Sequence, residues 1–120
     1  MPPRRIKTYT AETGYVYQYY FVGQRAALAD DPDAPGTEYI YDVSSDRKTT
    51  FAVSIIVKPE ALGAWQAAHG RALTGAEQYA TAKLRMLAGF DSIEKMVEAG
   101  RRLVVDAAGI EELLEPLSLT

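Results

Sequence analysis

The sequence predicts one α+β domain, in which a mainly antiparallel sheet of four strands is followed by three or four helices packed on one face of the sheet. Three observations lead to this fold class. In the first half of the chain, aromatic and β-branched residues recur at every second position. In the second half, apolar residues recur at helical spacing. The third observation is that 120 residues, 48% hydrophobic and 24% charged, suit a single globular domain over residues 1–120.

Four segments of the first half have the period of β-strands. Residues 15–22 place Tyr or Phe at every second position, and residues 38–44 continue this pattern. Residues 49–58 are apolar on both faces, which indicates a central strand, and Pro59 ends it because proline has no N–H to donate. We expect strands near residues 4–10, 15–22, 38–44 and 49–58.

The connection between the second and third expected strands is acidic and contains two prolines, which predicts a solvated loop. Asp31, Asp33, Gly36 and Asp42 occupy positions 1, 3, 6 and 12 of a calcium-binding loop. Position 5 is Pro35, which offers no side-chain oxygen, and position 12 is the shorter Asp where a bidentate Glu is wanted. We therefore expect no metal site here.

Two helices follow the last expected strand. A proline at the start and a glycine at the end indicate a helix over residues 59–69. Thr74 and Glu77 have the spacing of a capping box, which predicts the start of a second helix over residues 75–88. These helices are expected to cover one face of the sheet.

The last quarter of the chain is ambiguous. Residues 91–108 keep a helical period, although the apolar run within residues 101–106 alone suits a short strand. We expect one continuous helix over residues 91–108 and a short last helix over residues 110–117. The expected core contains Phe51, Val53, Ile55, Val57, Leu84, Leu87, Met96 and Val97.

Tyrosines give the strongest indication of a binding surface. The chain has eight, and a row of them can share one face of the sheet. Tyrosine combines a large apolar ring with a polar tip, which suits an interface or a stacking surface, although β-propensity alone also explains tyrosines in strands. We predict a non-enzymatic interaction module, a homodimer or a partner-binding protein, provided that the helices leave this face uncovered. The expected binding residues are Tyr15, Tyr17, Tyr19, Tyr39 and Tyr41.

A single-stranded nucleic-acid binder is the first alternative, because such proteins combine aromatic platforms with a basic groove. The formal net charge is −3 and the isoelectric point is near 5.1, which disfavours general electrostatic binding to the phosphates of a nucleic acid. No ribonucleoprotein signature is present. The basic rim of such a site would contain Arg4, Arg5, Lys7, Arg25, Arg47 and Lys48.

Recognisable enzyme chemistry is absent from the sequence. There is no cysteine, and His69 is the only histidine, placed near the end of a predicted helix where it complements the helix dipole. No phosphate-binding glycine loop and no nucleophile elbow occur. We expect no cofactor and no metal. A small ligand-binding protein or an enzyme without a known motif is the second alternative.

The sequence also predicts a cytoplasmic protein. The basic start of the chain is not followed by the apolar run of a signal peptide. The longest apolar stretch, residues 51–57, is far shorter than the ~20 residues of a membrane-spanning helix. We therefore expect no contact with a membrane.

Overall fold

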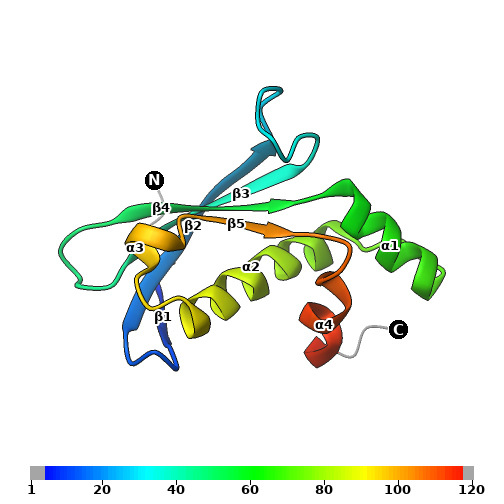
Figure 1. Cartoon of the computed structure of the whole chain (residues 1–120). Coiled ribbons are helices and arrows are strands. Elements are labelled where there is room, and N and C mark those ends of the chain that lie inside the picture. Colours follow the sequence, from blue (N-terminus) through cyan, green and yellow to red (C-terminus); the bar gives the residue numbers. More distant parts are fainter. Residues whose placement is uncertain (1–4, 118–120) are drawn as a thin grey trace.

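The computed structural model describes residues 5–117 and contains a mixed sheet of five strands in chain order (Figure 1). Strands β1 to β4 form an antiparallel meander, and β5 lies parallel to β4 at the far edge. The α+β class is therefore confirmed, whereas the expectation of four mainly antiparallel strands is wrong. The strands are β1 (Lys7–Thr10), β2 (Val16–Ala26), β3 (Thr37–Ser44), β4 (Phe51–Val57) and β5 (Arg102–Val105).

Four helices occur within the described residues: α1 (Pro59–His69), α2 (Gly75–Ser92), α3 (Met96–Ala99) and α4 (Ile110–Leu114), with a 3-10 turn η1 (Glu115–Leu117). The predicted capping box of Thr74 and Glu77 begins α2. The helix passes its expected end and continues to Ser92. Gly89 lets α2 pack closely against β5, since a Cβ at this position would lie 3.0 Å from the Leu103 side chain. No helix among residues 5–117 is long and apolar enough to cross a bilayer.

The predicted helix over residues 91–108 is wrong, because the chain forms α3 and then β5. Leu103 pairs with Ile55, and its side chain is buried against the core. Gly100 follows the last residue of α3 and packs against the Met96 side chain. A Cβ at this position would overlap the Met96 sulfur. Strand pairing with β5 satisfies the backbone groups on the outer edge of β4. The central position of β4 explains why it is apolar on both faces.

The core lies between the sheet and α2, which crosses one face of the sheet (Figure 1). The expected core is confirmed for five buried residues, Phe51, Val53, Ile55, Val57 and Met96. Leu84 and Leu87 pack at its margin and are partly buried. Val97 does not belong to the core, because it lies on the short α3 and its side chain is 49% exposed.

The opposite face of the sheet is covered at one end by the acidic loop between β2 and β3. The Arg102 guanidinium donates to the carboxylates of Asp31 and Asp33. Gly36 lies against Ile56, which is fully buried although it points away from α2. The loop is solvated as expected, since none of residues 27–36 is buried, and Asp31 and Asp33 also hold it on the sheet by ion pairs.

Candidate anion-binding recess

Most of the predicted tyrosine row lies in the core and not on the surface. Tyr17, Tyr19, Tyr39 and Tyr41 are each 6% exposed or less, and only Tyr15 is exposed. They are buried because α2 carries aromatic residues over them: Phe90 stacks on Tyr17, with ring centroids 4.2 Å apart. The condition for the predicted interaction module, a tyrosine face left uncovered by the helices, is not met.

One end of the row reaches the surface in a small recess of about 280 Å³ between β1, β2 and α2. The recess forms where β1 stops, since the ladder between β1 and β2 begins at Lys7 and Tyr19 while β2 continues to Ala26. It is lined by Arg5, Lys7, Tyr19, Tyr20, Phe21, Tyr41 and Tyr79.

The walls of the recess are aromatic. The rings of Phe21 and Tyr79 meet edge to face, with centroids 5.0 Å apart and an interplanar angle of 85°. Phe21 also contacts the ring of Tyr41 at 5.3 Å. Phe21 is 36% exposed and Tyr79 is half-buried, so both present surface to a ligand, whereas Tyr41 is fully buried behind them.

The Tyr41 hydroxyl is buried and has no hydrogen-bond partner among residues 5–117. Burial, followed by the nearby Tyr79 hydroxyl, raises the pKa of Tyr41, so the group keeps its proton. A buried polar group without a partner costs about 1–3 kcal/mol, and such groups in native proteins are few. The hydroxyl is therefore a buried polar group behind the wall of the recess, with the Tyr79 hydroxyl nearby.

Three cations surround the recess. Lys7 and Arg5 line it, and the Lys83 ammonium lies 5.8 Å from the centre of the Tyr19 ring, which is another part of the wall. Burial and the charge of Lys7 lower the pKa of Lys83. In the described part of the chain, none of the three cations lies within 4.0 Å of a carboxylate. No carboxylate of residues 5–117 pairs with their positive charge.

The structure brings four of the predicted site residues together in this recess: Arg5, Lys7, Tyr19 and Tyr41. Arg25 is instead paired with Glu38 at 2.7 Å, and Arg47 and Lys48 line a separate recess of about 190 Å³ on the opposite face. Arg4 lies outside the described residues.

Sequence reasoning missed Phe21, Tyr79 and Lys83 as site residues. Phe21 continues the tyrosine pattern of its strand, so its place on this face was visible. Tyr79 and Lys83 are four residues apart on a predicted helix and therefore share one side of it. The sequence does not show which side of the sheet meets that side of α2.

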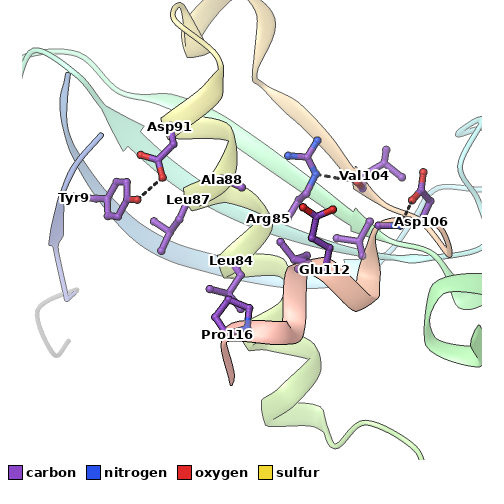
Figure 2. A pocket seen from close by; sticks show the side chains of 13 residues that line it. Tyr9, Leu84, Arg85, Leu87, Ala88, Asp91, Val104, Asp106, Glu112 and Pro116 are labelled. Carbon is purple, nitrogen blue, oxygen red and sulfur yellow. Dashed lines mark hydrogen bonds between the residues drawn. The ribbon is translucent and has the colours of Figure 1, made fainter. Parts of the chain in front are cut away.

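A second cavity of about 610 Å³ lies between α2 and α4 (Figure 2). Its wall includes the apolar side chains of Leu84 and Leu87, and several of its polar side chains form hydrogen bonds within the protein. The Tyr9 hydroxyl donates to Asp91 at 2.6 Å. In the same way, Arg85 Nε donates to the carbonyl of Val104 at 3.1 Å. This cavity is larger than the recess, but the recess is the stronger candidate because three cations border it and two of its aromatic rings present surface to a ligand.

His69 has a structural role. Its ring stacks on Trp65, with centroids 4.2 Å apart, and its Nε2 lies 2.7 Å from a carboxylate oxygen of Glu111. These contacts join α1 to α4. No group of three or more side chains that could hold a metal ion occurs among residues 5–117.

Comparison with known proteins assigns no family to this chain. No family model matches it, and neither a curated protein nor a solved structure is significantly similar. We therefore infer the function from the geometry of the recess.

Proposed function

We propose that this protein is a small ligand-binding protein and that the recess between β1, β2 and α2 holds the anionic group of its ligand. The observation that supports this function is a recess bordered by three cations that have no carboxylate partner among residues 5–117, with the buried hydroxyl of Tyr41, which has no partner among the same residues, behind its wall. This agrees with the second alternative from the sequence, a ligand-binding protein without a known motif.

The charges favour an anion for a physical reason. Lys7 and Lys83 repel each other in a partly buried setting, and like charges so placed are unfavourable. An anion between them replaces this repulsion by two attractions, and aromatic walls that exclude water strengthen both attractions. The Tyr41 hydroxyl would gain the acceptor that it lacks. One bound anion therefore satisfies both unusual features of the recess.

The direct test is titration with inorganic phosphate at constant ionic strength, followed by amide chemical shifts of the labelled protein. We expect shifts around Lys7, Phe21 and Lys83. Lys83→Gln should weaken binding by about tenfold, because a charge-assisted hydrogen bond contributes about 1.5–3 kcal/mol. Lys95→Gln, the same change at an exposed site on the loop before α3, is the matched control. Equal affinity of the two variants would contradict the proposal.

A second variant tests the hydroxyl. Tyr41→Phe should weaken phosphate binding, yet leave the ligand-free protein as stable as the wild type or up to about 1 kcal/mol more stable, because it removes an unsatisfied buried group. Urea denaturation with and without phosphate measures both effects. A loss of stability without phosphate would mean that the hydroxyl already has a partner.

Self-association is a second candidate function, and the free edge of β2 favours it. From Phe21 to Ala26, no strand among the described residues pairs with the outer edge of β2. Phe21 and Val22 are exposed at this edge, and such edges pair with other strands. A second copy of the chain can occupy it and extend the sheet.

Sedimentation velocity over a range of concentrations tests this second candidate. We expect a dimer for the wild type and a monomer for Val22→Lys, since a charged side chain at an edge opposes strand pairing. Val97→Lys changes an equally exposed valine on α3 and should remain a dimer. A wild-type protein that stays monomeric at high concentration would reject the β2 edge as a self-association site.

A further inference from the structure

We infer that the anion in the recess is a phosphate monoester attached to a planar aromatic ring. This inference rests on the anion-binding function proposed above and names its ligand class. Two features of the recess lead to it: the number of free cations and the exposed aromatic surface beside them.

The charge of the recess exceeds what a carboxylate needs. Arg5, Lys7 and Lys83 supply three positive charges without a carboxylate partner among residues 5–117. A carboxylate carries one negative charge, whereas a phosphate monoester carries about 1.5 to 2 at neutral pH and has three strong acceptor oxygens. Three acceptor oxygens suit the three cations that border the recess.

The exposed aromatic surface beside the cations favours a ligand that contains a planar ring. Phe21 is 36% exposed and is held edge to face against Tyr79, so its position is fixed. A free inorganic anion would leave this surface in contact with water. A planar ring attached to the phosphate would cover it, and stacking of rings on aromatic side chains is favourable for bases of any sequence.

The dimensions of the recess favour a small ligand over a polymer. Its volume is about 280 Å³, just below the range of about 300–1,000 Å³ for small-molecule sites. The wider rim offers few other phosphate contacts, because Arg25 is paired with Glu38 and Arg47 lies at a separate recess on the opposite face. A nucleic-acid strand needs several such contacts for useful affinity at physiological salt.

A mononucleotide and a phosphotyrosine side chain share this chemistry, and calorimetric titration distinguishes them. The probes are adenosine 5′-monophosphate, N-acetyl-phosphotyrosine amide, adenosine, inorganic phosphate and an eight-nucleotide oligothymidylate. We expect at least one of the two ring phosphates to bind ~10-fold or more tightly than inorganic phosphate, and adenosine to bind weakly. The tighter of the two identifies the source of the ring.

The role of the ring is tested by variants of Phe21. In the Phe21→Leu variant the ring phosphate should no longer bind more tightly than inorganic phosphate, whereas Phe21→Tyr should retain the difference between the two ligands. Tyr15→Leu, at an exposed aromatic residue outside the recess, is the control and should change neither. Retention of phosphate binding shows that each variant is folded.

The unfavourable outcomes are distinct. If inorganic phosphate binds as tightly as both ring phosphates, the ring is rejected and the anion site stands. If neither phosphate nor a ring phosphate binds, the proposed function itself is rejected. Adenosine binding as tightly as its monophosphate would reject the phosphate, and markedly tighter binding of the oligonucleotide would indicate a polymer ligand.

Discussion

Individual tyrosines of this protein have different roles, and their surroundings decide which. Tyr17 is a core residue that stacks on Phe90. Tyr9 uses its hydroxyl to bind Asp91, and so joins β1 to the end of α2. Tyr41 is equally buried, but its hydroxyl has no hydrogen-bond partner among the described residues. The residue type alone therefore says little about function.

Tyr9 allows a direct test of the contact between β1 and α2. Tyr9→Phe removes a 2.6 Å hydrogen bond to a carboxylate and leaves Asp91 with the backbone N–H of Glu12. We expect a loss of about 1.5–3 kcal/mol in the free energy of unfolding, the range for a hydrogen bond to a charged acceptor. Urea denaturation measures it.

Tyr15→Phe is the control for this prediction, because Tyr15 is exposed and removal of its hydroxyl should change stability by less than about 0.5 kcal/mol. If both variants were equally stable, the bond between Tyr9 and Asp91 would be irrelevant to the anchoring of β1.

Among the elements, α2 determines both the core and the recess. Its start is fixed by the capping box and by Arg71, whose guanidinium donates to both carboxylate oxygens of Glu77 at 2.8 and 2.9 Å. Its residues then cover the tyrosine face from Tyr79 at one end to Phe90 at the other. The recess exists because α2 extends beside β2 where β1 is absent.

The elements with a strong local signal were predictable from the sequence. The capping box of α2 and the alternation in β2 are properties of neighbouring residues, and they define these elements without tertiary contacts. β5 has only four residues, and its strand conformation is selected by pairing with β4 at the sheet edge. Over residues 102–105 a helical and a strand pattern compete locally, so only that tertiary contact decides between them.

The candidate site was predictable only in part, for the same reason. Lys7 and Tyr19 could be predicted as site residues because they lie in the first two expected strands. Tyr79 and Lys83 join them only because α2 lies across the tyrosine face, and this packing also buries the row that was expected to be exposed. The sequence gives no sign of which sheet face the helix selects when both faces of a strand carry aromatic or apolar residues.

In the whole molecule, the distribution of charge explains how an acidic protein can hold an anion. The chain carries a net charge of −3, yet the acidic loop is engaged elsewhere. Arg102 binds Asp31 and Asp33, and Arg25 binds Glu38. These ion pairs keep the loop carboxylates away from the cations of the recess. A positive site thus persists in a negatively charged molecule.

The buried tyrosines predict that the whole fold loses stability at alkaline pH. A hydrogen bond to Asp91 and then burial raise the pKa of Tyr9 to about 12, and burial raises the pKa of Tyr17, Tyr19, Tyr39 and Tyr41. In the unfolded chain these groups ionise at about pH 10. Above that pH the folded state binds more protons than the unfolded state, so the free energy of unfolding falls as pH rises.

We therefore expect the urea midpoint to be insensitive to tyrosine ionisation below about pH 10 and to decrease between about pH 10 and 12. Tyrosinate absorbance should rise together with the loss of circular dichroism, because the core tyrosines can ionise only when α2 leaves the sheet. Ionisation of these tyrosines at about pH 10 in a protein that keeps its helical signal would contradict their burial. That result would mean that the tyrosine row is exposed, as the interaction module predicted from the sequence requires.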